Sequence, residues 1–351
     1  MPALPGPGAW PARPARSRCP AARRHLVILG GYLAAGVASA WPRASYLAHH
    51  RLPATRDAAA YVWCFGWVAQ LLGHLSSLWF TRYLASPVGT QLGLHVLMPL
   101  EGVVMAPITV AFGPSASYNL LSAAVPGLLC YGAYRVASLW LPSQAGAVPA
   151  GWPGNLPGAV MPAGYRVGTM PTTMPALDRP IASDHSGPIV VEFPFGICGG
   201  TPTCGAQFAP EAQVLATADG HPRAVGFIAR VPAPTLTGIK AHALYAGLVR
   251  IWQAAARNSP AEVAAARLDV RAMNVGWVLV WPQQHAQRGK LVRYFNPGVT
   301  GYLRQTGVRF AYQADGVLVY QVASPVARHE NRLRPVTIRV SRSGLRPSAL
   351  G

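Results

Sequence analysis

The distribution of acidic residues is the feature that most constrains this chain. Asp57 and Glu101 are the only acids in residues 1–177, and the stretches around them are apolar and nearly free of charge. Uncharged stretches of this kind are typical of helices in or near a lipid bilayer. An acid at or near a membrane is energetically costly, so it indicates a functional site by default. The sequence therefore indicates a membrane protein and makes Asp57 its first candidate residue.

Four stretches of the N-terminal half are candidates for membrane helices. Residues 25–41 are about as long as one crossing, and residues 93–112 and 117–141 are each long enough to span about 30 Å of hydrocarbon. Residues 58–81 carry no charge but are rich in Trp, Phe and Tyr, which favour the membrane–water interface. We therefore expect about three transmembrane helices and one interfacial helix, with an extracytoplasmic loop over residues 43–92. A fourth crossing by residues 58–81 would instead leave the C-terminal half in the cytoplasm.

The formal net charge of +19 does not indicate a nucleic-acid partner. Charged residues make up only 12% of the chain, and the imbalance comes from missing acids rather than from a hydrated basic face. Membrane lipid is the expected partner of these charges instead. Residues 1–24 are rich in Pro, Ala and Arg, which predicts a disordered segment and, under the positive-inside rule, a cytoplasmic N-terminus.

Two local features leave alternatives open. The arginines at 23–24, the apolar stretch after them and the Ala-Ser-Ala at 38–40 also resemble a signal peptide with its cleavage site. Cys198 and Cys204 flank a short Gly-rich loop, which a disulfide could close in an oxidising compartment. Too few ligands lie nearby for a metal site, so none is expected.

After residue 141 the composition changes. Residues 142–188 are rich in Pro, Gly, Ala and Met without apolar periodicity, which predicts a linker. Residues 189–323 predict a small α/β domain, and residues 324–351 a disordered basic tail. The expected fold is thus an α-helical membrane region over 25–141 followed by a small α/β extracytoplasmic domain. The clearest local signals in that domain predict strands over 189–195 and 276–281, helices over 238–257 and 260–273, and a hairpin over 308–322 that turns at Asp315-Gly316.

Four short motifs follow one another between residues 52 and 141. They are an Asp-Ala-Ala-Ala-Tyr-Val-Trp segment at 57–63, an aromatic–Pro–Gly strip at 79–89, a His-Val-Leu-Met-Pro segment at 95–99, and Gly-Pro followed by Tyr-Asn-Leu at 113–120. In order and spacing these motifs resemble the first extracytoplasmic loop and early helices of bacterial GT-C-type integral-membrane glycosyltransferases. Segments 191–196 and 316–320 are similar to the soluble tail of such proteins.

The resemblance implies transfer of a sugar from a polyprenyl-phosphate donor at the outer face of the cell membrane. In that reaction Asp57 would be the general base or the contact of a divalent metal, the cofactor being otherwise unspecified. Arg56 or Arg82 would hold the donor phosphate, and His95 would touch the substrate. Members of the family usually have many more crossings where this chain has a linker. The chain therefore resembles the two ends of a larger enzyme joined together.

Each candidate residue has a structural alternative. Asp57 could cap a helix that begins at Ala58, because Asp is a preferred N-cap residue. His95 could be a packed, hydrogen-bonded residue, and Glu101 could pair with Arg135 or stay neutral among the helices. For the whole chain the alternatives are a transferase inactive through truncation, one completed by a partner subunit that supplies the missing helices, or a non-catalytic membrane-anchored protein whose α/β domain binds an envelope partner.

Overall fold

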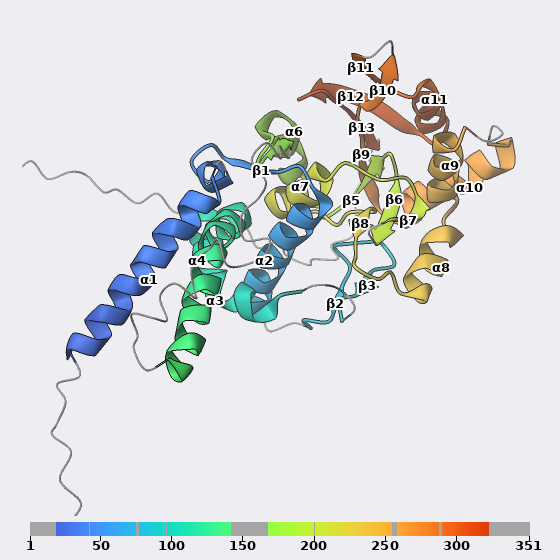
Figure 1. Cartoon of the computed structure of the whole chain (residues 1–351). Helices are drawn as coiled ribbons and strands as arrows, with labels where there is room; N and C mark the ends of the chain where they lie inside the picture. The colour runs from blue at the N-terminus through green and yellow to red at the C-terminus, as the bar shows by residue number, and fades with distance from the viewer. Residues whose placement is uncertain are drawn as a thin grey trace, which may run out of the picture. The chain divides into compact units, whose positions relative to one another are not determined.

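The computed structural model describes residues 19–41, 43–74, 77–93, 95, 97–141, 168–199, 201–254, 258–287 and 290–322 (Figure 1). The chain divides into two compact units. The first unit contains residues 1–44 and 121–165, and the second contains residues 45–120 and 166–351. Helix α4 (Pro114–Trp140) contributes its first residues to the second unit and the remainder to the first.

The first unit is built from α1 (Cys19–Ser39) and most of α4. The two helices pack backbone against backbone at a pair of glycines. A Cβ atom added to Gly36 would lie 2.4 Å from the Gly127 nitrogen, so no larger residue fits there without moving a helix. Next to this contact Tyr32, Cys130 and Tyr134 form a small buried cluster. Small residues that let helix backbones approach are typical of helix pairs inside membranes.

Among the described residues, α4 is the one helix long and apolar enough to cross a membrane, judged by length and composition. The described residues therefore do not show the three transmembrane helices that the sequence predicts. Within the apolar stretch 93–112 the helix α3 (Pro99–Phe112) has only 14 residues. At 1.5 Å per residue it is about 21 Å long, which is short of a bilayer core. Of the expected span 25–41, residues 25–39 fall within α1, whose sequence includes two arginines.

The second unit contains a four-stranded sheet with the strand order β12-β13-β9-β5. Strands β5 (Ile189–Phe193) and β9 (Val275–Val280) are parallel, and β13 (Val317–Val322) pairs antiparallel with both β9 and β12 (Val308–Ala314). Every residue of β5 and β9 is buried, as their continuous apolar sequences predict. The hairpin predicted at Asp315-Gly316 is confirmed, with positive φ angles of 50° and 78° at its two turn residues.

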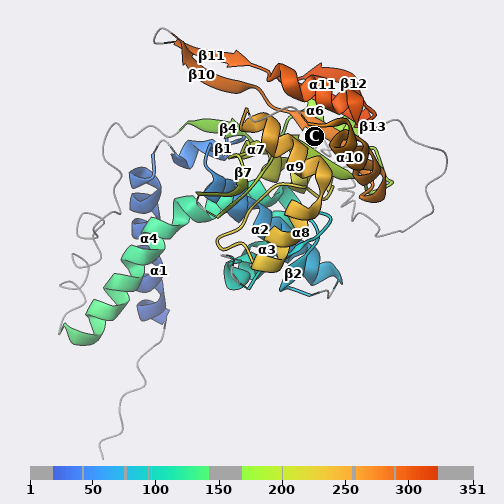
Figure 2. The same cartoon turned by 90° about the vertical axis from the view of Figure 1, so that its right-hand side faces the viewer.

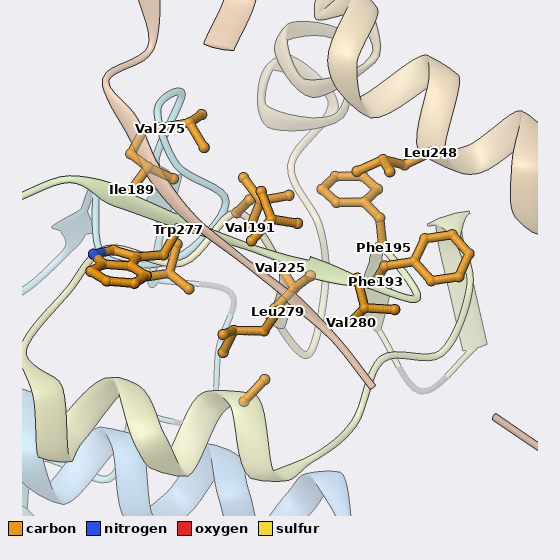
Figure 3. Packing of buried hydrophobic residues seen from close by; sticks show 14 of the residues in the cluster. Ile189, Val191, Phe193, Phe195, Val225, Leu248, Val275, Trp277, Leu279 and Val280 are labelled. Carbon is orange, nitrogen blue, oxygen red and sulfur yellow. The ribbon is translucent and has the colours of Figure 1, made fainter. Parts of the chain in front are cut away.

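Several helices of the second unit bury apolar residues in the same core. Figure 3 shows Val191 and Phe193 of β5, Leu279 of β9 and Leu248 of α9 in one cluster. The helix predicted over 260–273 is confirmed and begins with a capping box of Ser259 and Glu262, whereas the one predicted over 238–257 is divided in two at His242. The helices are α6 (Pro175–Ala182), α7 (Glu211–Asp219), α8 (Ala233–Ala241), α9 (Ala243–Trp252), α10 (Pro260–Ala272) and α11 (Pro297–Gln305).

Short strand pairs complete the second unit. The Gly-rich segment predicted as a loop at Cys198–Cys204 forms two strands of a small sheet, and both cysteines are free thiols. The short strands are β1 (Arg51–Pro53) with β4 (Thr169–Pro171), β2 (Phe80–Thr81) with β3 (Thr90–Gln91), β6 (Gly196–Gly199) with β7 (Thr201–Gly205) and β8 (Gly226–Phe227), and the ribbon of β10 (Gln283–Gln287) and β11 (Lys290–Tyr294), which Figure 2 shows.

Helix α2 (Arg56–His74) differs from the interfacial helix expected over residues 58–81. It lies within the second unit, and Trp63, Phe65 and Leu71 are among the many side chains that it buries there. The physical reason is that aromatic residues suit a protein core as well as a membrane interface. Residues 168–188 of the expected linker include β4 and α6. The remainder of that linker, the N-terminal segment 1–18 and the tail from 323 onward lie outside the described residues.

Candidate functional site

A cavity of about 210 Å³ lies in the second unit. Asp57, Ala60 and Tyr61 of α2 form one wall, and His95, from the segment just before α3, lies among its lining residues. The opposite residues come from the small β6–β7–β8 sheet and its surroundings. They are Gly199, Phe227 and Ala229. The cavity therefore brings together a carboxylate, an imidazole and a phenol.

Asp57 is held in the first turn of α2 but does not cap the helix. Thr55 does so, since its side-chain Oγ1 accepts a hydrogen bond of 3.2 Å from the Ala58 nitrogen and its carbonyl one of 3.1 Å from Ala59. The Asp57 side chain is exposed, and no described residue forms a hydrogen bond or ion pair with its carboxylate. The N-cap role considered for Asp57 is therefore taken by Thr55. The carboxylate remains available to a ligand, close to the positive end of the helix dipole.

His95 is a neutral hydrogen-bond donor. Burial lowers its pKa to about 4, so the ring is uncharged at neutral pH. Its Nδ1 atom accepts a hydrogen bond of 3.2 Å from the backbone nitrogen of Ala229, which places the ring proton on Nε2. Nε2 is buried and has no partner among the described residues. An unpaired buried donor is costly in a folded protein, and at the wall of a cavity it suits a ligand acceptor.

Tyr61 completes the polar part of the wall. It lies one helical turn after Asp57 and stacks on Tyr118, with ring centroids 6.4 Å apart. Burial, together with the charge of Asp57, raises the pKa of Tyr61, so its hydroxyl keeps its proton. It can therefore donate a hydrogen bond to a ligand or accept one.

Arg56 and Arg82, the two arginines predicted to hold the donor phosphate, lie in different places. Arg56 lies next to Asp57, donates a hydrogen bond from Nη2 to Oε1 of Gln207, and keeps a buried Nε without a described partner. Arg82 is exposed and does not line the cavity. Glu101 is also exposed, in the first turn of α3, and is absent from the lining. The structure thus brings Asp57 and His95 together, keeps Arg56 adjacent and leaves Arg82 outside.

Sequence reasoning did not identify Tyr61, Phe227 and Ala229. Tyr61 carried a usable signal, because a residue four positions after an acid lies on the same helix face. Phe227 and Ala229 carried none. They reach the cavity because β8 pairs parallel to β6, with Phe227 opposite Cys198, and a long-range pairing of this kind leaves no local pattern.

The cavity does not fit a divalent metal. Asp57 is its only carboxylate, and His95 carries its proton on the nitrogen that would have to bind the ion. The described part of the chain contains no group of three or more His, Cys, Asp or Glu side chains that could hold a metal ion. The expected contact between Asp57 and a metal has no support from the donor set.

A second group of charged side chains lies in the core of the same unit. Arg223 pairs with Glu192 of β5 at 2.9 Å and with Asp219 of α7, and both Arg223 and Glu192 are fully buried. Asp178 of α6 is a third acid nearby. Burial, together with the nearby Asp219 carboxylate, raises the pKa of Glu192 to about 8 and that of Asp178 to about 6, although Arg223 acts to lower both. This Arg223 cluster joins β5, α6 and α7.

Comparisons with family models, with curated proteins and with solved structures found no match to this chain. The function of the chain is therefore inferred from the chemistry of the cavity.

Proposed function

We propose that this chain is a membrane-associated glycosyltransferase that transfers a sugar from a polyprenyl-phosphate donor, with the cavity of Asp57 and His95 as its reaction centre. The observation that carries the proposal is the position of these two residues. They were selected separately from the sequence, and they line one cavity in the structure. Both have an unused hydrogen-bonding atom among the described residues.

The side chains present suit a sugar transfer. An acceptor hydroxyl would give its proton to the Asp57 carboxylate while its oxygen attacks the anomeric carbon of the donor. The bond from that carbon to the phosphate oxygen breaks, and the phosphate leaves with the bonding electrons. The Nε2–H group of His95 would donate to a sugar or acceptor oxygen and so fix its orientation. The guanidinium of Arg56, beside Asp57, is the nearest candidate for the charge of the leaving phosphate.

The size of the cavity limits which part of a donor it can hold. At about 210 Å³ it is smaller than the roughly 300–1,000 Å³ that is usual for drug-sized ligands. It can hold the reacting group but not the polyprenyl chain. The chain of the donor would remain outside the cavity, in the bilayer, which agrees with a protein that has a helix able to span a membrane.

We further propose a multi-pass topology with the second unit on the extracytoplasmic side. The basic N-terminal segment favours the cytoplasm. Because β1 pairs with β4, residues 51–53 and 169–171 must lie on the same side of any membrane. A crossing by α4 alone would separate them, so this topology requires one more crossing between Pro53 and Thr169, and α3 is too short to provide it. Reporter fusions at Ala54 and Gly168 should give the same extracytoplasmic signal, and opposite signals would exclude this topology.

The central experiment is the Asp57→Asn variant, assayed in membranes with a polyprenyl-phosphate sugar. Asparagine keeps the shape of the side chain but cannot take a proton, so the rate should fall about 100-fold or more. The matched control is Glu101→Gln, which neutralises the other acid of the N-terminal half outside the cavity and should leave the rate nearly unchanged. Equal rates in Asp57→Asn and the parent chain would refute the assignment. No rate from any correctly inserted parent chain would favour the non-catalytic envelope-binding alternative or the need for a partner subunit.

A further inference from the structure

Helix α3 packs within the second unit through mostly small side chains. Its buried residues are Gly102, Met105, Ala106 and Thr109. A Cβ atom added to Gly102 would lie 2.8 Å from the Val68 side chain of α2, so the two helices are in close contact at this glycine. The buried face of α3 is therefore narrow, and Met105 is its one long side chain.

The large apolar side chains of α3 point the other way. Leu100 is 73% exposed, Val104 66% and Phe112 74%, and Val103 and Val110 are about half exposed. Pro107 and Ala111 are exposed on the same helix. We call these seven residues the outer face of α3. A surface helix of a water-soluble protein has the opposite arrangement, with polar residues outside and large apolar ones inside. A contiguous apolar surface of this kind marks an interaction site.

We propose that the outer face of α3 is embedded in a lipid bilayer and docks the second unit on the membrane. Two observations favour lipid over a protein partner. Only Gly113 separates α3 from α4, the helix long and apolar enough to cross a membrane, and no charged residue occurs from Gly102 to Tyr134. The outer face also lacks Trp, Tyr and Arg, which dominate the binding energy of protein–protein interfaces, and consists of Leu, Val, Pro, Ala and one Phe.

The length of α3 determines how it lies in the bilayer. At about 21 Å it is too short to cross the hydrocarbon core, and Glu101 is exposed at its first turn. The helix therefore lies along the membrane surface with the outer face in the acyl region and Glu101 at the headgroups. His95 lies four residues before the start of α3, so the docked helix holds the cavity of Asp57 close to the membrane and within reach of a lipid-borne molecule. The docking itself does not depend on the proposed reaction.

Site-directed fluorescence tests this surface in the full chain. Val104→Cys places a label on the outer face, and Ala265→Cys places the same label on the exposed side of α10 as the matched control. Each protein is labelled with an environment-sensitive fluorophore and reconstituted into phosphatidylcholine–phosphatidylglycerol vesicles with and without nitroxide-bearing lipids. The labelled parent chain gives the background from its own cysteines. We expect blue-shifted emission and at least about threefold stronger lipid quenching at Val104→Cys than at Ala265→Cys.

The remaining outcomes of this experiment would overturn the docking proposal. Equal quenching at the two positions would overturn the proposal. A blue-shifted but unquenched label, together with disulfide crosslinking between copies of Val104→Cys, would overturn it in favour of a second copy of the chain. If Val104→Cys does not fold, Phe112→Cys provides the same measurement at the other end of the face. Repeating the assay on an Asp57→Asn background should leave quenching unchanged, so the docking and the proposed reaction can fail independently.

Discussion

The second unit contains one buried cluster of charged side chains and one exposed carboxylate at the cavity. In the Arg223 cluster the charges are withdrawn from water, and the arginine pairs with both Glu192 and Asp219. At the cavity, the Asp57 carboxylate is exposed and has no partner among the described residues. A buried charge is tolerated only when it is paired, whereas an exposed charge needs no partner. The fold therefore depends on the Arg223 cluster but not on Asp57, which is the pattern expected of a residue kept for function.

Arg223→Met should have the largest effect on stability. The substitution leaves three acids in the core without their shared cation, and breaking a buried pair in this way costs about 3–5 kcal/mol of unfolding free energy. Chemical unfolding of the detergent-solubilised chain, followed by circular dichroism, measures the loss. Arg82→Met removes an exposed arginine and should change stability by no more than about 0.5 kcal/mol. Similar losses in both variants would show that Arg223 has no special role.

The pH dependence of stability should come from the same cluster. Glu192 has its pKa raised from 4.5 to about 8 and Asp178 from 3.8 to about 6, mainly through burial. The folded state therefore binds these protons more tightly than the unfolded chain. The stability that this gives is fully present below the unfolded pKa values and is lost as the pH rises through the folded ones. Unfolding free energies measured at a series of pH values should fall between about pH 5 and pH 8.

Glu192→Gln separates this effect from general alkaline destabilisation. Glutamine can still accept the hydrogen bond from Arg223 but cannot lose a proton, so the decline above about pH 6 should flatten. Asp57→Asn serves as the control, because it removes a carboxyl group outside the cluster and should leave the slope unchanged. A slope that Glu192→Gln does not alter would mean that other groups titrate in this range.

The parts of the fold that sequence predicted are those with local signals. The turn at Asp315-Gly316 and the capping box at Ser259 depend on neighbouring residues, and both are present. The membrane helices were predicted less well, because hydrophobic length and aromatic content do not distinguish lipid from a protein core. The aromatic residues of α2 lie in the core for that reason. Helix α3 is shorter than the apolar stretch 93–112, and Leu97 of that stretch joins a buried cluster instead.

The candidate site was predictable only in part. Asp57 and His95 could be selected because polar residues are rare in the N-terminal half. The wall contributed by Phe227 and Ala229, and the pairing of Glu192 with Arg223, depend on contacts between distant segments. No local pattern indicates that Glu192, the single acid of β5, pairs with an arginine beyond the next helix.

The smallest expected changes in stability are those at the N-terminus of α2, where Thr55 and Asp57 can be compared. Thr55→Ala removes the hydroxyl that caps the helix and should lower the unfolding free energy by about 1 kcal/mol, at any salt concentration. Thr55→Ser keeps the hydroxyl and should restore most of it. Asp57→Ala removes only a favourable charge near the helix N-terminus, which is worth about 0.3–1 kcal/mol at low ionic strength. Because salt screens that charge, the effect of Asp57→Ala should fall toward zero at about 1 M salt, while that of Thr55→Ala persists. A loss from Asp57→Ala that is as large as that from Thr55→Ala and insensitive to salt would make Asp57 a structural residue and remove the main reason to place catalysis there.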